Sequence, residues 1–268
     1  MSTPNTQGTA LITGASSGIG AAYADRLAAR GFDLLLVARD QARLETLAGE
    51  LRKRTSVKVE VLKADLTDAS HVSALEQRLR TDASITLLLN NAGVASNSAL
   101  AEADMDEVDR LIQLNIVALT HLASAAAAGF VARRRGAIIN IASVVPMMPE
   151  RFNAVYAASK AYVLSLTQSL NAEIGEKGVQ VQAVMPGATR TEIWERAGID
   201  LNAFPPEMVM DVNEMVDAAL AGFDQKELVT LPSLSNAADW DAFVNARLAL
   251  GPNLSLQHAA ARYKTPGA

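Results

Sequence analysis

Short aliphatic segments alternate with longer helical segments along most of this chain, and this alternation constrains its fold more than any other feature. The aliphatic segments carry few charges, which is typical of strands buried on both faces of a parallel sheet. The segments between them space apolar residues three or four positions apart, as helices do. The alternation predicts an α/β fold with three layers, in which helices cover both faces of a doubly wound parallel sheet.

The boundaries of the elements follow from the same periodicity. We expect strands at residues 9–13, 33–38, 57–62, 85–89, 137–141, 179–184 and 227–231. We expect helices at residues 19–30, 40–54, 68–80, 105–134 and 154–174, and an amphipathic helix at 236–250. The periodicity lapses over residues 186–206, and irregular segments of this length are often functional loops. We therefore expect a single domain over residues 1–268, with a substrate loop at 188–210 and a C-terminal extension at 232–268.

Composition excludes several classes of function. The 268 residues include no cysteine, which rules out disulfides, thiolate zinc sites, iron–sulfur clusters and a cysteine nucleophile. A formal net charge of -5 argues against nucleic acid as a partner, because nucleic-acid binders usually present a basic face. The most apolar run, residues 115–132, contains Asn, Thr, His and Ser, and residues 1–8 are polar. We therefore expect a cytoplasmic protein with no membrane span, no signal peptide and no metal site.

A glycine-rich turn follows the first expected strand, at Thr13-Gly14-Ala15-Ser16-Ser17-Gly18-Ile19-Gly20. Glycine lets the backbone approach a ligand, and the N-terminus of the next helix offers free N–H groups and a positive dipole to a pyrophosphate. In a Rossmann-like sheet this turn binds the cofactor. The candidate cofactor contacts here are Gly14, Ser16, Ser17, Gly18, Ile19 and Gly20.

The same turn also matches the G-x-S-x-G nucleophile elbow of hydrolases. An elbow normally follows several strands, because an earlier loop supplies part of the oxyanion hole, and only one strand is expected before this turn. A hydrolase also needs a histidine partner, and His71, His121 and His258 stand in no supporting motif. The sequence therefore favours a nucleotide-binding turn over a hydrolase site.

The second expected strand ends in Val37-Ala38-Arg39-Asp40, where a dinucleotide-binding sheet meets the adenosine ribose. Proteins that bind NAD usually have an acidic residue at this place, whereas an arginine accommodates the 2′-phosphate of NADP. Arg39 can present a planar fork of donors to that phosphate, and Asp40 is explained as the N-cap of the next helix. The sequence favours NADP(H) and leaves NAD(H) open.

Tyr156 and Lys160 stand four positions apart on one face of an expected helix. A tyrosine with a pKa of ~10 is a poor base near neutral pH, and lowering that pKa to ~7 requires about 4 kcal/mol. An ammonium in a partly dry cleft, helped by a cationic nicotinamide, can supply stabilisation of that order. Tyr156 would then exchange a proton with an alcohol or a carbonyl while hydride moves to or from the cofactor. Ser143 follows an expected strand thirteen residues earlier, where strand ends border the cleft of such sheets.

Taken together, these residues resemble the compact, single-domain branch of the short-chain dehydrogenase/reductase family. The resemblance runs in order over about residues 8–195. Its motifs are Thr13 to Gly20, Asn90-Asn91-Ala92-Gly93, Asn115, Ser143, Tyr156 with Lys160, and Pro186-Gly187 with Thr191. The resemblance implies an enzyme that transfers a hydride between NADP(H) and a small carbonyl or alcohol substrate.

The resemblance also implies a role for each matching residue. It implies that Tyr156 is the general acid/base, that Ser143 holds the substrate oxygen, and that Lys160 lowers the tyrosine pKa and binds the nicotinamide ribose. Asn115 would anchor a water that links Lys160 to solvent. The implied cofactor contacts at the adenine, the central cleft and the nicotinamide are Asp65, Leu66, Asn91, Ala92, Gly93, Pro186, Gly187, Thr189 and Thr191.

Two positions depart from the family pattern. Ser17 stands where some members that use NADP have a basic residue, so phosphate recognition would depend on Arg39, with Arg43 as a second donor. Thr189 stands where members often have an aliphatic residue, which leaves its contact with the nicotinamide open.

The substrate is the least specified part of the prediction. Three segments are expected to border its pocket, residues 94–99, 144–153 and 188–206. The candidate substrate contacts are Ser143, Val145, Met147, Phe152, Tyr156 and Trp194. Because most are apolar, as in other small-molecule pockets, we expect a mainly apolar carbonyl or alcohol. The family resemblance also implies a homodimer or homotetramer, and a catalytically silent NADP-binding sensor or scaffold protein is the alternative, since a fold does not fix a function.

Overall fold

The computed structural model describes residues 7–264; residues 1–6 of the polar start and residues 265–268 of the C-terminal extension lie outside the described residues. By its internal contacts the chain divides into two compact units, with the boundary between Pro232 and Ser233. The first unit contains a parallel sheet with its helices, and the second, over its described residues 233–264, contains one α-helix and two short 3-10 helices.

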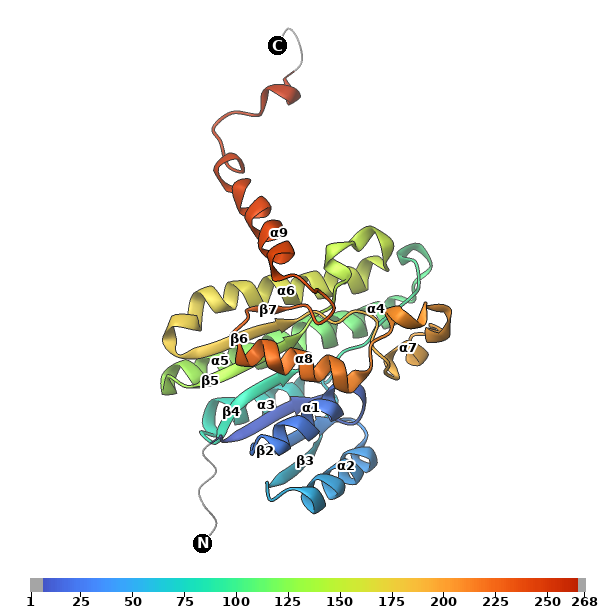
Figure 1. Cartoon of the computed structure of the whole chain (residues 1–268), viewed down its shortest axis with the longest axis vertical. Coiled ribbons are helices and arrows are strands. Elements are labelled where there is room, and N and C mark those ends of the chain that lie inside the picture. The colour runs from blue at the N-terminus through green and yellow to red at the C-terminus, as the bar shows by residue number, and fades with distance from the viewer. Residues whose placement is uncertain (1–6, 265–268) are drawn as a thin grey trace. The chain divides into compact units, whose positions relative to one another are not determined.

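The first unit is built on a seven-stranded parallel sheet with the strand order β3-β2-β1-β4-β5-β6-β7 (Figure 1). Its strands are β1 (Thr9–Thr13), β2 (Asp33–Ala38), β3 (Val59–Lys63), β4 (Ile85–Asn90), β5 (Gly136–Ile141), β6 (Val179–Val184) and β7 (Val229–Thr230). Its helices are α1 (Gly18–Ala29), α2 (Gln41–Arg54), α3 (Ala69–Thr81), α4 (Met105–Ile112), α5 (Leu119–Arg133), α6 (Ala154–Ile174), α7 (Ile193–Arg196) and α8 (Val212–Asp224). The predicted Rossmann-like, doubly wound α/β fold is confirmed, in a single domain.

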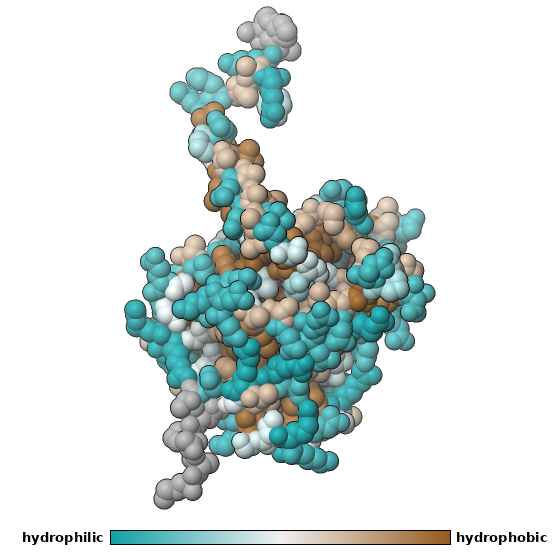
Figure 2. Space-filling view, viewed as in Figure 1, coloured by the Kyte–Doolittle hydropathy of each residue, from teal (hydrophilic) through white to brown (hydrophobic). Residues whose placement is uncertain are grey.

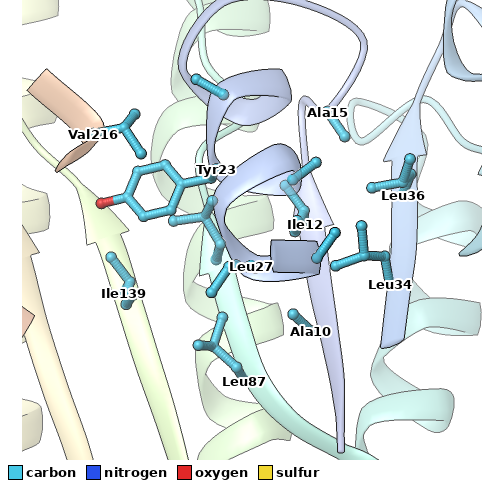
Figure 3. Packing of buried hydrophobic residues seen from close by; sticks show 14 of the residues in the cluster. Ala10, Ile12, Ala15, Tyr23, Leu27, Leu34, Leu36, Leu87, Ile139 and Val216 are labelled. Atoms are coloured by element: carbon cyan, nitrogen blue, oxygen red, sulfur yellow. The ribbon is translucent and has the colours of Figure 1, made fainter. Parts of the chain in front are cut away.

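Two hydrophobic clusters hold the three layers together, one on each face of the sheet. Helices α1, α2 and α8 pack on one face, and α3, α5 and α6 pack on the other. Neighbouring strand residues alternate between the clusters, so that Ile12 of β1 belongs to the first and Leu11 to the second. Figure 3 shows part of the first cluster, where Tyr23 of α1 lies between Val216 of α8 and Ile139 of β5. Each fully buried aliphatic side chain in these two clusters contributes roughly 1.5–3 kcal/mol to folding.

The strand order reverses between β1 and β4, which makes the ends of these strands a topological switch point. Cofactors of doubly wound proteins bind in the crevice outside the carboxyl ends of the strands at such a point. The glycine-rich turn follows β1, and Asn91 follows β4 directly. The Nδ2 atom of Asn91 donates a hydrogen bond of 2.9 Å to the carbonyl oxygen of Thr13, so the two segments are in contact.

The helix expected over residues 105–134 is continuous but changes its geometry at the centre. Helix α4 passes into a π-helical segment, Gln113–Ala118, which passes into α5. Such segments are rare, and they occur frequently at functional sites. By length and composition alone Met105–Arg133 could cross a membrane, but 56% of its most apolar window is buried inside the domain. The core helix of a soluble domain has the same composition, and its burial accounts for the apolar residues.

Helix α8 is the main element that the sequence periodicity did not predict. Asp211 caps it by accepting hydrogen bonds from the backbone N–H groups of two residues in its first turn. Its apolar face joins the cluster formed with α1. Two ion pairs link its outer side to α1, Arg26 with Asp217 at 2.7 Å and Arg30 with Asp224 at 2.8 Å. The expected elements are present, with ends that match or are shifted by at most two residues, and β7 is shorter than predicted.

The second unit contains helix α9 (Ala237–Ala249), close to the predicted range, with Asn236 as its N-cap. The rings of Trp240 and Phe243 lie 5.4 Å apart between centroids. None of the residues of α9 is buried. Figure 2 shows apolar side chains at the surface of this unit, and Leu248 is 59% exposed.

Candidate active site

Close backbone packing fixes the glycine-rich turn. Gly14 has a φ of +66°, and a Cβ atom placed on it would lie 2.8 Å from Nδ2 of Asn91 and 2.9 Å from Cα of Ala92. A Cβ atom on Gly20 would lie 2.4 Å from the carbonyl oxygen of Gly14. Neither position therefore has room for a side chain, so the turn can keep this path only with glycine at both places.

The N-terminus of α1 fits an anionic ligand. Ser17 is the N-cap, but its side chain makes no capping hydrogen bond, and the first turn contains no acidic residue. The N–H groups of this turn, next to the partly buried Ser16 and Ile19, are available to a pyrophosphate together with the positive end of the helix dipole. Thr191 borders the turn, because a Cβ atom on Gly18 would lie 3.2 Å from its Cγ2 atom. The residues present thus fit the phosphates of a dinucleotide.

The hydroxyl of Thr13 joins β1 to the segment after β4. Its Oγ1 atom accepts hydrogen bonds of 3.0 Å from the backbone N–H groups of Asn91 and Ala92. The same hydroxyl donates to the carbonyl oxygen of Leu89 at 3.2 Å. Asn91, Ala92 and Gly93 are all partly buried beside the turn. The structure therefore brings the predicted contacts after β1 and β4 together.

At the end of β2, Arg39 is exposed, and among residues 7–264 it makes no hydrogen bond and no ion pair. The positive charge of Arg39 lowers the pKa of Asp65. Burial raises the pKa of this carboxyl, but hydrogen bonds from Thr67 and the charges of Arg39 and His71 together keep it below its usual range. Leu66, next to Asp65, is buried. Arg39 is thus a free cation beside the position expected to contact the adenine.

Arg43, the second predicted phosphate donor, is already engaged. Its Nη1 atom lies 2.7 Å from Oε2 and 3.0 Å from Oε1 of Glu192, a residue of the predicted substrate loop. Arg43 also lies 3.5 Å from Asp40, the N-cap of α2. The two candidate arginines therefore differ, one free and one paired.

Asn115 lies in the π-helical segment and is buried. Its Oδ1 atom accepts from the backbone N–H of Val94 at 3.0 Å, and its Nδ2 atom donates to the carbonyl oxygen of Val94 at 2.9 Å and to Oγ of Ser159 at 3.2 Å. A Cβ atom on Gly93 would lie 3.1 Å from this Oδ1 atom, so the residue before Val94 must stay small. The amide of Asn115 thus links the segment after β4 to helix α6.

Helix α6 brings Tyr156 and Lys160 to the end of β5. The hydroxyl of Ser143, which follows β5 and is 8% exposed, lies close enough to the Tyr156 phenol to lower its pKa. The Nζ atom of Lys160 lies 5.8 Å from the centroid of the Tyr156 ring and donates a 2.9 Å hydrogen bond to the carbonyl oxygen of Ile141. Three residues from two separate motifs thus form one cluster.

Burial controls the protonation of this cluster. It raises the pKa of Tyr156 to about 12, and the interaction with Ser143 offsets only part of that rise. Burial also lowers the pKa of Lys160 to about 8. The expected shift of the phenol toward neutral pH is therefore reversed in the protein alone, because both groups are withdrawn from water. At neutral pH the cluster holds a neutral phenol beside an ammonium.

The expected nicotinamide contacts lie after β6. Pro186 is buried, and its carbonyl oxygen accepts from the backbone N–H of Val144 at 3.0 Å and from Oγ of Ser143 at 3.4 Å. Thr189 is also buried, and its hydroxyl donates to the carbonyl oxygen of Gly187 at 3.2 Å. This hydrogen bond explains how a threonine fits the position where an aliphatic residue was expected.

The predicted substrate contacts are not equally placed. Val145 is buried and its N–H donates to Oγ of Ser143 at 3.3 Å, whereas Met147 is partly buried and Phe152 is 42% exposed. The indole N–H of Trp194 donates to the carbonyl oxygen of Thr189 at 2.7 Å. An open hollow of about 500 Å³ lies on the segment around Trp194. Its lining residues are Arg190, Thr191, Glu192, Trp194, Glu195, Ile199, Asp200, Leu201 and Asn202.

Comparison with known proteins decides the family. A sequence model described as short chain dehydrogenase matches residues 8–202. The chain belongs to the short-chain dehydrogenase family. The resemblance inferred from the ordered motifs is thereby confirmed, and it covers the sheet from β1 through β6.

Several relatives of this short-chain dehydrogenase are known. It is similar to the structure of a short-chain dehydrogenase from Sphingobium yanoikuyae in complex with NADPH, with 54% identity, a TM-score of 0.93 and coverage of 96% of this chain and 100% of that chain. A bulky-bulky ketone specific alcohol dehydrogenase from Comamonas testosteroni is 49% identical, with a TM-score of 0.88 and coverage of 96% and 98%. An NADPH-dependent 1-acyldihydroxyacetone phosphate reductase from Schizosaccharomyces pombe is 29% identical over 92% of this chain and 90% of that protein.

Two residues that hold the cluster in this short-chain dehydrogenase were not singled out from the sequence. Asn153 caps α6, and its Oδ1 atom accepts from the backbone N–H of Tyr156 at 3.0 Å. An asparagine directly before a predicted helix is a signal that could have identified it. Ser159 accepts from Asn115 and donates to the carbonyl oxygen of Tyr156 at 2.8 Å. No local pattern marks Ser159, because its partner is distant in the sequence.

Proposed function

We propose that this short-chain dehydrogenase is an NADP(H)-preferring oxidoreductase acting on CH–OH or C=O groups, with Tyr156 as general acid/base. The observation that carries the proposal is the placement of Tyr156 beside both Ser143 and the buried ammonium of Lys160, whose Nζ atom lies 5.8 Å from the Tyr156 ring centroid. A positioned proton donor and a second hydroxyl are the groups that a carbonyl needs when it becomes an alkoxide. In the direction of reduction, Tyr156 gives its proton to the substrate oxygen while Ser143 orients that oxygen.

The cofactor would supply the hydride and, when oxidised, a positive ring near the phenol. The glycine-rich turn would hold its pyrophosphate, Lys160 its nicotinamide ribose and Arg39 its 2′-phosphate. Support for the 2′-phosphate comes from the free guanidinium of Arg39 beside Asp65. Further support comes from the relative from Sphingobium yanoikuyae, which is described in complex with NADPH.

We propose a mainly apolar ketone, or the corresponding secondary alcohol, as the substrate. The apolar character of Val145, Met147, Phe152 and Trp194 supports this choice. The relative from Comamonas testosteroni, described as specific for bulky-bulky ketones, suggests a substrate with a large group on each side of the carbonyl. Residues 188–210 would form the substrate loop of a single catalytic domain, and residues 232–268 would be its extension.

We further propose a cytoplasmic homo-oligomer without nucleic-acid or membrane partners. The apolar helix Met105–Arg133 is largely buried in its own domain, and the net charge of -5 disfavours nucleic acid. The family resemblance supports a homodimer or homotetramer. Sedimentation of the purified protein measures the number of subunits directly.

The test is steady-state oxidation of NADPH and of NADH with ketones that range from acetone to diaryl ketones. We expect turnover with NADPH and bulky ketones, and a loss of about 10³-fold in Tyr156→Phe, since general acid–base catalysis contributes on this scale. NADPH binding should survive in that variant. Tyr162→Phe is the matched control, because Tyr162 lies on the same helix, is exposed and contacts Thr120. Tight NADPH binding without turnover on any ketone would support the sensor or scaffold instead.

A further inference from the structure

An ion pair joins the adenosine end of the cofactor site to the predicted substrate loop. Arg43 lies in the first turn of α2, and its Nη1 atom contacts both carboxylate oxygens of Glu192, at 2.7 and 3.0 Å. Its backbone N–H donates to Asp40, the residue that directly follows Arg39. The guanidinium that Glu192 holds therefore belongs to the same helix terminus as the predicted 2′-phosphate contact.

The neighbours of Glu192 also lie close to the glycine-rich turn. Thr191 approaches Gly18, where a Cβ atom would lie 3.2 Å from the threonine methyl group. The base of the loop is tied by two backbone hydrogen bonds of 2.9 Å, from Met210 N–H to Ala188 and from Arg190 N–H to Met210. Glu192 is thus only two residues from Arg190, whose backbone is held by these hydrogen bonds, so the backbone holds the Glu192 carboxylate near α2.

Glu192 is a carboxylate that contacts two arginines, Arg43 and Arg196. The Arg43 guanidinium holds the pKa of Glu192 below its usual range, so the carboxylate is ionised at neutral pH. Glu192 also contacts Arg196 on its own helix, and Arg43 also contacts Asp40. While the Nη1 group of Arg43 donates to both carboxylate oxygens of Glu192, it cannot present the same donors to a phosphate.

We propose that Glu192 competes with the 2′-phosphate of the cofactor for Arg43, and that Glu192 thereby limits the preference of the protein for NADP(H) over NAD(H). The inference rests on the proposed use of NADP(H). Arg39 then acts as the resident phosphate contact, and Arg43 becomes a second one only when it leaves Glu192. Because binding couplings are reciprocal, a bound 2′-phosphate also weakens the attachment of the loop to α2.

The test is a double-mutant cycle read out by calorimetric titration with 2′,5′-ADP, which carries the 2′-phosphate, and with 5′-AMP, which lacks it. Glu192→Gln should tighten binding of 2′,5′-ADP about 5-fold, a coupling of the size found between contacting residues, and leave 5′-AMP unchanged. In the Arg43→Met background the same substitution should change binding by less than about 2-fold. Glu195→Gln is the matched control, since Glu195 is an exposed carboxylate of the same helix, and no change is expected.

An equal tightening by Glu192→Gln in the Arg43→Met background would overturn the proposal, because it would show plain charge repulsion without competition. An effect on 5′-AMP as large as that on 2′,5′-ADP, or no effect on either ligand, would overturn it as well. A failure of the proposed cofactor is a separate result: the unsubstituted protein would then bind 2′,5′-ADP no better than 5′-AMP, and Arg39→Ala would change neither.

Discussion

The two parts of the candidate site are stabilised in different ways. The buried part consists of the glycine-rich turn and the cluster of Ser143, Tyr156 and Lys160, where backbone packing and internal hydrogen bonds leave little free volume. The more exposed part is the loop at 188–210, in which the Trp194 ring packs at a tilt against Phe204, with 5.6 Å between the ring centroids, and donates to Thr189. The helix α7 within this loop contains no buried residue.

This difference predicts how substitutions in each part affect stability and ligand binding. A substitution in the buried part alters the path of the backbone, so it affects folding together with cofactor binding. A substitution in the loop alters contacts that are partly shared with water, so it affects ligand binding with a small cost in stability. The following predictions test this contrast, beginning with the largest expected effect.

Gly20→Ala should lower the free energy of unfolding by about 3 kcal/mol, because its Cβ atom would lie 2.4 Å from the carbonyl oxygen of Gly14. Gly49→Ala is the matched control in helix α2, where a Cβ atom would meet nothing within 4 Å. Alanine should stabilise that helix by about 1 kcal/mol. Urea denaturation of the two variants measures both effects. Equal stabilities would show that the turn is not closely packed.

Lys160→Met should remove a pH dependence from the stability. Burial lowers the pKa of Lys160 to about 8, so the folded protein binds this proton more weakly than the unfolded chain does. Lowering the pH from 10 to 7 therefore destabilises the wild-type protein relative to Lys160→Met, by about 2.5 kcal/mol. Denaturant titrations of both proteins at several pH values between 7 and 10 measure this difference. Parallel pH profiles would show that the ammonium is solvated.

Arg39→Ala should weaken NADPH binding about 30-fold, or about 2 kcal/mol, the scale of a lost hydrogen bond to a charged group. NADH binding should change little, because NADH has no 2′-phosphate. Fluorescence titration of each reduced cofactor measures the two dissociation constants. Equal losses for both cofactors would contradict the assignment of Arg39 to the phosphate.

Trp194→Ala should have the smallest effect on stability, about 1 kcal/mol, because Trp194 and Phe204 are only partly buried and an aromatic pair contributes about that much beyond its burial. The KM for a bulky ketone should rise several-fold, since the indole no longer orders the loop through Thr189. Thermal unfolding and steady-state kinetics on the same preparation separate the two effects. A large loss of stability would mean that the loop belongs to the folding core.

Much of the fold was predictable because burial imposes simple patterns on strands and helices. The aliphatic strands β1, β2 and β6 were predicted to the residue, and Asp40 caps α2 as expected. Helix α8 was missed although Asp211 is a typical N-cap, since it follows a segment without clear periodicity. The π-helical segment was not predictable, because widening one turn leaves no mark in the pattern of side chains.

The residues of the candidate site could be predicted from the sequence, but their burial, their pKa values and their long-range contacts could not. The spacing of Tyr156 and Lys160 indicates that they share a helix face, and the structure brings Ser143 to the same place. The direction of the phenol pKa depends on how much water the folded chain excludes, and the sequence gives no measure of that. The attachment of Arg43 to Glu192 was likewise not predictable, because the two residues lie far apart in the sequence.

The parallel bridge between Thr189 and Met210 has a consequence for how enzymes of this kind diversify. Bridged strands lie about 4.8 Å apart, so the chain leaves and re-enters the domain at almost the same point. Replacing the residues between these two anchors, or lengthening them, adds only a small loop-closure entropy, about 0.6 kcal/mol for each doubling of length. Exchanging the segment between relatives should therefore cost little stability, but the exchange also replaces Thr191 beside Gly18 and Glu192 on Arg43, so cofactor preference should change together with substrate range.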